Sequence, residues 1–229
     1  MADRLWPPAL RGSEVLFQIV STSRSGGQSI EGNEQIVLAP TGRWKARFTL
    51  PIADRRRGPR ADQVLAFRWV FSGGRASTIL VPAADGRGPG HRAGIVPCGY
   101  HVPFSDGAFF SDGSGFGEKY TTAFFAADAA LNATQVSINL TAGLQLLPGM
   151  RFSTPDGRLH EIRDVVSFDG GTIWTVTVSP WLRAAYPATV ALEFDQPCCR
   201  MRLAADDSAA LSLMNNRFGS PSLELVEAN

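Results

Sequence analysis

The fold is decided by two stretches of sequence, TQVSINL at Thr134–Leu140 and TIWTVTV at Thr172–Val178. In both, apolar and polar side chains alternate with a period of two, the pattern of a half-buried β-strand. This alternation places Trp174 on the inward face together with the valines that follow it. Turn residues separate these strands from their neighbours, as at Pro148-Gly149, Pro155-Asp156-Gly157 and Asp169-Gly170-Gly171.

Two more strands are expected in the same region, at Ile162–Phe168 and Thr189–Phe194. No helical period lies between the four strands, and the connections are short. Strands of this length joined by turns predict a small antiparallel β-barrel over residues 131–196.

The residues before and after this barrel form a second β-rich pattern. Strands are expected at Val15–Val20, Gln35–Leu38, Trp44–Leu50 and Thr78–Val81, with a polar loop over Ser21–Gly32. One helix is predicted over Ala61–Phe71, ended by Gly73-Gly74. The fold class is therefore mainly β. A discontinuous β-sandwich or barrel domain with one helix (1–90 plus 197–229) carries an inserted antiparallel barrel (131–196), reached through a Gly- and Asp-rich connector (91–130).

Composition limits the classes of function. The chain of 229 residues has 44% hydrophobic and 19% charged residues, which is typical of a folded globular protein. Its net charge of +1 provides no overall field for nucleic acid or an anionic membrane, so neither partner is expected. No apolar run reaches the roughly 20 residues of a membrane helix. The first eight residues lack an apolar core segment, so no secretory signal is expected.

The sequence contains no convincing motif for catalysis, metal binding or cofactor binding. Three cysteines, with Cys198 and Cys199 adjacent, fit reduced thiols better than a disulfide framework. Cys98 and His101 have C-x-x-H spacing, but the adjacent pair Cys198-Cys199 fits the other half of a zinc site badly. The loop around Asp106 and Asp112 lacks the calcium-binding frame. No nucleotide-binding or nucleophile motif occurs, and Glu118 and Asp128 form no recognisable carboxylate pair. We therefore expect no cofactor, no metal and no enzymatic activity.

The sequence fits assembly with other subunits through strands and loops better than it fits an enzymatic or metal-binding function. Many edge strands and a nearly neutral surface favour strand-to-strand contacts between subunits. Exposed cations in the N-terminal half are candidates for pairing with acidic neighbours: Arg43, Arg47, Arg55, Arg56 and Arg57. Trp6, beside Pro7-Pro8, is a further candidate because an extended N-terminal arm can dock on a neighbour.

Several short strings resemble the distal tail proteins of long-tailed bacteriophages. They are EG at Glu31–Gly32, GRW at Gly42–Trp44, GRA at Gly74–Ala76 and ILVP at Ile79–Pro82, followed by the doubled FSDG at Phe104–Gly107 and Phe110–Gly113. LPGMRF at Leu147–Phe152, LHEI at Leu159–Ile162 and PWLR at Pro180–Arg183 look like the inserted barrel of such proteins. CRMRLA at Cys199–Ala204 and SLELVEA at Ser222–Ala228 look like their return strands.

This resemblance implies a non-enzymatic virion protein of the tail tip, made in the host cytoplasm. The discontinuous domain would be a belt that forms a homo-oligomeric ring, commonly hexameric, between the tail tube protein and the tip hub or baseplate. The alternative from another class is a carbohydrate-binding β-sandwich module for host adsorption, with Trp181 and Tyr186 as the candidate sugar contacts. A third hypothesis, a tail-tip peptidoglycan hydrolase, lacks a carboxylate pair.

Overall fold

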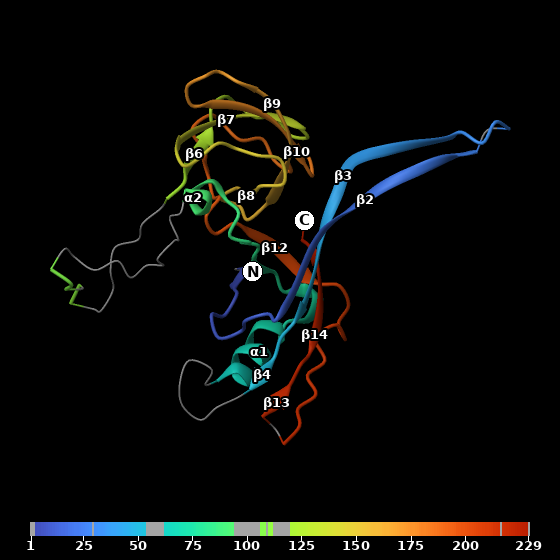
Figure 1. The fold of residues 1–229 in the computed structure, drawn as a ribbon. Helices are drawn as coiled ribbons and strands as arrows, with labels where there is room; N and C mark the ends of the chain where they lie inside the picture. Colours follow the sequence, from blue (N-terminus) through green and yellow to red (C-terminus); the bar gives the residue numbers. More distant parts are fainter. Residues whose placement is uncertain are drawn as a thin grey trace. The chain divides into compact units, whose positions relative to one another are not determined.

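The structure is a computed structural model that describes residues 3–28, 30–53, 62–93, 106–108, 110–111, 120–215 and 217–228. The chain divides into two compact units, one formed by residues 1–82 and 198–229 and the other by residues 83–197 (Figure 1). The first unit is therefore discontinuous in sequence, and the second is inserted into it.

A mixed six-stranded sheet organises the first unit, in the order β1-β5-β12-β14-β3-β2. Its strands are β1 (Arg4–Leu5), β2 (Glu14–Gln28), β3 (Glu34–Thr49), β5 (Ile79–Pro82), β12 (Cys198–Leu203) and β14 (Ser222–Glu227). The pair β1–β5 is parallel and the other pairs are antiparallel. A separate ladder joins β4 (Ile52–Ala53) to β13 (Phe218–Gly219).

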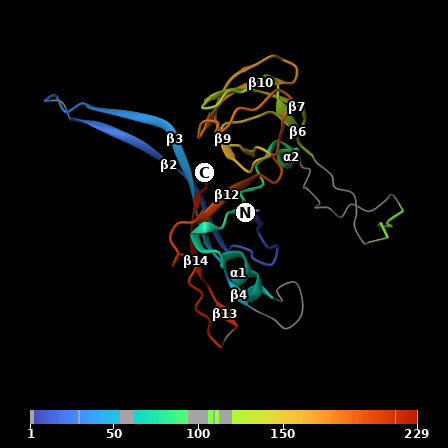
Figure 2. The same cartoon turned by 180° about the vertical axis from the view of Figure 1, so that it is seen from behind.

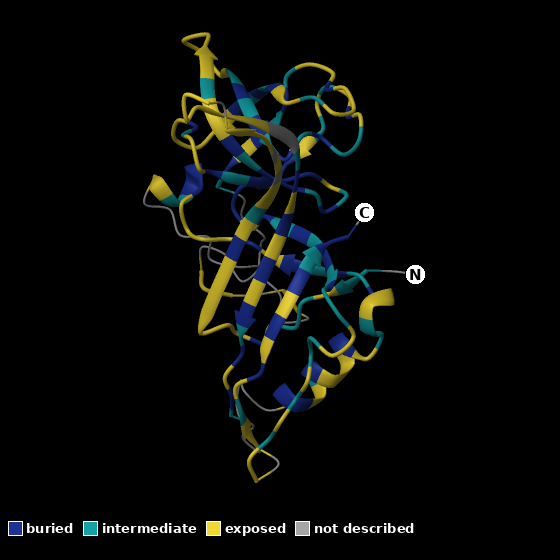
Figure 3. Cartoon of the chain, turned by 90° about the vertical axis from the view of Figure 1, so that its right-hand side faces the viewer, coloured by how far each residue is buried: buried dark blue, intermediate teal, exposed yellow. Residues whose placement is uncertain are grey.

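Alternation along β3 builds the core of this unit, as the sequence predicts. Trp44, Ala46 and Phe48 are buried, whereas Lys45 and Arg47 between them are exposed. The paired strand β14 shows the same period of two, and Figure 3 shows the alternation along the sheet. A core on only one face of the sheet follows from this pattern.

The predicted helix is present as α1 (Gln63–Phe71). It buries Val64, Phe67 and Val70, which lie three residues apart on one face. The helix ends at Phe71 with Ser72 as its C-cap, rather than with a glycine, and Gly74 instead begins the 3₁₀ turn η1 (Gly74–Ala76) with φ +54°. One further helical turn, α2 (Pro89–Arg92), was not predicted, because four residues are too short to show a helical period.

The predicted break between two N-terminal strands is wrong. β2 continues through the expected loop to Gln28, and β3 is one strand from Glu34 to Thr49 with Pro40 inside it. Proline is tolerated there because β14 pairs with β3 only from Lys45 onward, so β3 has a single partner at Pro40. Serines and glycines in the expected loop concealed a part of β2 in which every side chain of described burial is exposed.

The second unit is an antiparallel six-stranded barrel-like sheet in the order β11-β6-β7-β10-β9-β8. Its strands are β6 (Thr122–Phe125), β7 (Gln135–Ala142), β8 (Arg151–Ser153), β9 (Leu159–Phe168), β10 (Ile173–Ser179) and β11 (Ala191–Leu192). Reciprocal backbone hydrogen bonds between Ser153 and Glu193, both 2.9 Å, link the two ends of the sheet. The antiparallel barrel predicted from the sequence is thus nearly closed.

The barrel core comes from the inward faces of β7 and β10. Val136, Ile138, Val176 and Val178 are all buried in one apolar cluster. The sequence assigned residues 120–130 to the connector, but β6 contributes buried Ala123 and Phe125 to the same cluster. Their alanine and phenylalanine content fits either a strand or a short helix, and the structure has a strand there.

Candidate assembly surface

The most unusual feature of the first unit is the far part of the β2–β3 hairpin. We call it the distal ribbon: Ser21–Gln28 of β2 with Glu34–Thr41 of β3. The two segments pair antiparallel, for example Ser25 with Ile36 and Gln28 with Glu34. Among the described residues no third strand joins them, and the ribbon extends beyond the rest of the sheet (Figures 1 and 2).

The distal ribbon has no core of its own. Every side chain whose burial the structure describes between Ser21 and Val37 is exposed. Three of these side chains are large and apolar: Ile30 at the tip, Ile36 at 62% and Val37 at 61% exposure. An isolated two-stranded hairpin is marginally stable in water. A hairpin of this length that also exposes isoleucine and valine is expected to gain stability when another surface covers it.

The outer edge of β2 is open. β2 is the last strand of the sheet, and no described strand pairs with its far side. Backbone N–H and C=O groups along such an edge form a template for an additional strand. Val15, Leu16 and Val20 add partly exposed apolar side chains to the same strand. The edge therefore combines backbone pairing capacity with apolar surface.

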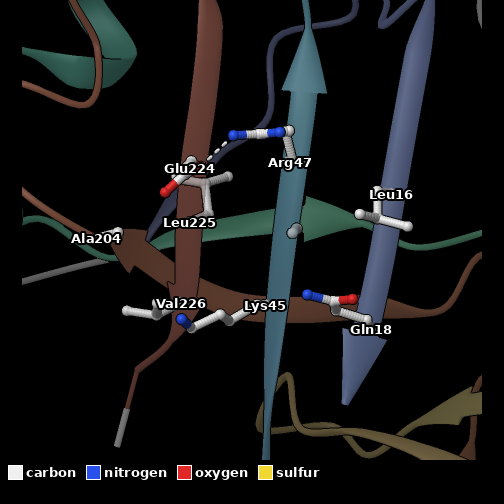
Figure 4. Close-up of a pocket in the computed structure, with 9 residues that line it drawn as sticks. Leu16, Gln18, Lys45, Arg47, Ala204, Glu224, Leu225 and Val226 are labelled. Carbon is white, nitrogen blue, oxygen red and sulfur yellow. Dashed lines mark hydrogen bonds and ion pairs between the residues drawn. The ribbon is translucent and has the colours of Figure 1, made fainter. Parts of the chain in front are cut away.

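A shallow groove of about 260 Å³ crosses the outer face of β2, β3 and β14 (Figure 4). Two cross-strand rows line it, Leu16–Arg47–Glu224 and Gln18–Lys45–Val226. In Figure 4, Arg47 reaches Glu224 at 2.7 Å, whereas the Lys45 side chain extends toward Val226. The ion pair is more than half exposed on both sides and is worth less than about 1 kcal/mol.

The predicted assembly contacts divide into three groups. Arg43 and Arg47 lie exposed on the outer face of β3, beside or within the groove. Arg55, Arg56 and Arg57 lie outside the described residues. Trp6 belongs to the unit's own packing instead: its ring centroid lies 5.1 Å from that of Phe48, and its Nε1 donates to the Leu10 carbonyl at 2.7 Å.

Trp6 is therefore no free docking residue. The segment before it pairs with β5 through β1, which attaches the N-terminal residues to the sheet. The sequence missed a different exposed aromatic, Trp69, which lies one helical turn after exposed Leu65 on the outer face of α1. The Arg4 guanidinium lies 5.7 Å from the centre of the Trp69 ring. The i,i+4 spacing of Leu65 and Trp69 was the only sequence signal for this patch.

The two predicted sugar contacts have different surroundings. Trp181 is partly exposed. Tyr186 is buried, stacks on Phe125 with ring centroids 5.6 Å apart, and donates its hydroxyl to Asp156 at 2.9 Å. Burial raises the pKa of Tyr186 to about 12. With its ring inside the barrel core, Tyr186 cannot act as a stacking platform.

A different aromatic pair is accessible on the barrel. Trp174 is half-buried rather than fully inward, and it stacks on exposed Phe168 with centroids 4.1 Å apart. The two residues face each other across β9 and β10 next to the turn that joins these strands. Exposed Ile173 precedes Trp174. The pair was missed because alternation alone predicted Trp174 to be part of the core.

No catalytic arrangement is evident in the part of the chain that the structure describes. His160 is buried, its Nδ1 bonds to the Pro180 carbonyl at 2.9 Å, and burial lowers its pKa to about 4. No group of three or more His, Cys, Asp or Glu side chains that could hold a metal ion occurs among the described residues. Cys98, His101 and Glu118 lie outside them, so the expected absence of metal and of enzymatic activity stays a prediction.

Within the described ranges, no helix is long and apolar enough to cross a membrane. A comparison with models of known protein families finds no match, and a comparison with curated proteins finds no similar sequence.

Proposed function

We propose that this chain is a non-enzymatic structural protein that assembles into a homo-oligomeric ring, as a component of a bacteriophage tail tip. The observation that carries the proposal is the distal ribbon with the open edge of β2. In the virion the ring would join the tail tube protein to the tip hub or baseplate, after assembly in the host cytoplasm. The short strings that resemble distal tail proteins support this proposed place of the ring in the virion.

The two units differ in a way that supports assembly through the first. In the barrel, the terminal strands β8 and β11 are short and are linked by the Ser153–Glu193 hydrogen bonds. The first unit leaves β2, a strand of 15 residues, as an open edge. Natural proteins usually shorten or cover such edges because they invite further pairing. A long open edge is therefore expected to have a protein partner.

Ring closure also requires two different complementary surfaces on each subunit. The ribbon and the turn at its tip provide one, with exposed Ile36 and Val37 and the acidic side chains of Glu34 on the ribbon and Glu31 in the turn. The outer face of β3 provides a second, with exposed Arg43 and Lys45. Opposite charge on the two surfaces favours contact between neighbours in one orientation.

The test is the solution mass of the full chain by light scattering at about 0.15 M and about 0.5 M NaCl. We expect a discrete ring of about six subunits that survives the higher salt, because apolar and backbone contacts are screened little. The double variant Ile36→Glu, Val37→Glu should be monomeric. Val166→Glu, which places one glutamate at an exposed position on the barrel, should assemble like wild type.

A folded wild-type monomer at every concentration would contradict the ring. If the double variant assembles to the same mass as wild type, the ribbon is not part of the interface between subunits. Circular dichroism of each variant separates a failure to assemble from a failure to fold.

The accessible Phe168–Trp174 pair favours a second candidate function, a carbohydrate-binding module, because sugar rings stack on aromatic faces through their apolar C–H groups. A glycan array distinguishes the two. Binding that is lost in Phe168→Ala, from a monomeric protein, would support the module. No binding together with a stable ring would support the structural function.

A further inference from the structure

An arginine-lined groove on the second unit is separate from the assembly surface. It has a volume of about 580 Å³ and is lined by the segments 85–87, Arg92 and 147–151. This volume lies within the range of about 300–1,000 Å³ that is usual for small-molecule sites. Arg87 and Arg92 come from one wall, and Arg151 comes from the other.

Charge in this groove is unbalanced. Three of its lining side chains are guanidinium groups and one, Asp85, is a carboxylate, although acidic and basic residues are nearly equal in number over the whole chain. The Arg87 backbone N–H donates to Asp85 at 3.1 Å, but the Arg87 guanidinium touches this carboxylate through one contact of 3.4 Å, and the Arg87 side chain is 80% exposed. Such a pair is weak and leaves most of the five guanidinium N–H donors available. Arg92 has no ion pair among the described residues.

Both walls are held by hydrogen bonds to neighbouring segments. On the first, the Gly90 N–H donates to Thr121 Oγ1 at 3.0 Å, and this hydroxyl donates to buried Asp195 at 2.6 Å. On the second, the Gly149 N–H donates to the Ile162 carbonyl at 2.7 Å. The backbones that carry the arginines are therefore fixed before a ligand arrives, which lowers the entropic cost of binding.

The lining between the arginines is apolar. Leu147 is partly buried and Met150 is buried, and both border the groove. Arg151 extends from the adjoining strand β8 and also contacts Glu161 at 3.4 Å, so its charge is partly compensated. A ligand that fits this surface combines an anionic group with an uncharged body.

We propose that this groove binds an organic phosphate, with the phosphate at Arg87 and Arg92 and the organic part over Leu147 and Met150. Guanidinium forks match the oxygens of phosphate in a bidentate geometry. A tetrahedral phosphate presents oxygens to two guanidinium groups at once, those of Arg87 and Arg92, whereas a planar carboxylate is satisfied by one guanidinium. The groove lies within one unit, so the proposal does not depend on ring assembly.

The test is calorimetric titration of the full chain with glycerol 3-phosphate, with inorganic phosphate, and with glycerol as the neutral control. We expect a Kd of about 1 mM for the ester, weaker binding of inorganic phosphate, and no binding of glycerol. Arg92→Gln should raise the Kd of the ester about tenfold, since it removes a charged hydrogen-bond donor. Arg163→Gln, an exposed arginine on β9 outside the groove, should leave the Kd within about twofold of wild type.

An unchanged Kd in Arg92→Gln, or no heat with either phosphate, would overturn the site. Equal affinity for the ester and inorganic phosphate would refute recognition of the organic part, because Leu147 and Met150 would then contribute nothing to binding. If Arg92→Gln does not fold, Arg87→Gln is tested in its place. In addition, binding of the ester to the wild-type protein should weaken when NaCl is raised from about 0.15 M to about 0.5 M.

Discussion

The buried histidine of the barrel makes the stability of the second unit depend on pH. His160 is 1% exposed, and its Nδ1 bonds to the Pro180 carbonyl, which only accepts hydrogen bonds. Its Nε2 has no hydrogen-bond partner within the described structure. Burial therefore favours the neutral ring and lowers the pKa of His160 from 6.5 to about 4.

The sign of the effect follows from proton binding. Between these two pKa values the unfolded chain binds more protons than the folded chain, so acid favours unfolding. The contribution of neutral His160 to the free energy of unfolding is fully present above pH 6.5 and is lost as the pH falls toward 4. Between about pH 7.5 and about pH 5 the loss is about 2 kcal/mol, and it reaches about 3 kcal/mol at lower pH.

Two measurements test this reasoning. NMR titration of the three histidine Cε1–H signals should leave the His160 signal unchanged down to about pH 5, with the assignment taken from His160→Gln. Urea unfolding of wild type and His160→Gln at about pH 7.5 and about pH 5 should show the extra loss of about 2 kcal/mol only in wild type. A His160 signal that titrates near 6.5, or equal losses in both proteins, would refute the argument.

Two further predictions concern stability. Asp195→Ala should destabilise the second unit by about 3 kcal/mol, because it leaves the backbone N–H and hydroxyl of Thr121 without their buried acceptor. Thermal unfolding measures this loss. A loss below about 1 kcal/mol would contradict the prediction. Trp44→Ala should destabilise the first unit by about 3–5 kcal/mol because the side chain is fully buried, whereas Leu65→Ala, at 60% exposure, should change stability by less than about 0.5 kcal/mol. Similar urea midpoints for these two variants would show that the assigned burial is wrong.

The sequence predicted those parts of the fold that depend on local alternation. Trp44 to Leu50 and Thr172 to Val178 each place apolar side chains on one face, and both form the strands expected of them. Turn residues such as Pro148-Gly149 defined the ends of strands. The helix was predicted from the spacing of Ala61, Val64, Leu65 and Trp69, but the face that the structure buries carries Val64, Phe67 and Val70, and Leu65 and Trp69 are exposed. These signals need no knowledge of distant residues, since one buried face determines each pattern.

Prediction failed where an element has no buried face or is very short. The β2 half of the distal ribbon, Ser21–Gln28, is polar and rich in serine and glycine, so its composition resembled a loop although its backbone is paired. β6 and α2 have four residues each, too few for a period to be visible.

By itself the sequence determined the mainly β class and the inward faces of the long strands, because alternation is a property of neighbouring residues. Only the tertiary structure decided which side chains stay accessible. It buried Tyr186 against Phe125, docked Trp6 on Phe48, and left Trp174 partly exposed beside Phe168. It also brought Arg92 into one groove with Arg151. Most of these contacts join residues far apart in the chain. Even for Phe168 and Trp174, which are neighbours across one turn, exposure depends on which surfaces pack together, so no local pattern encodes it.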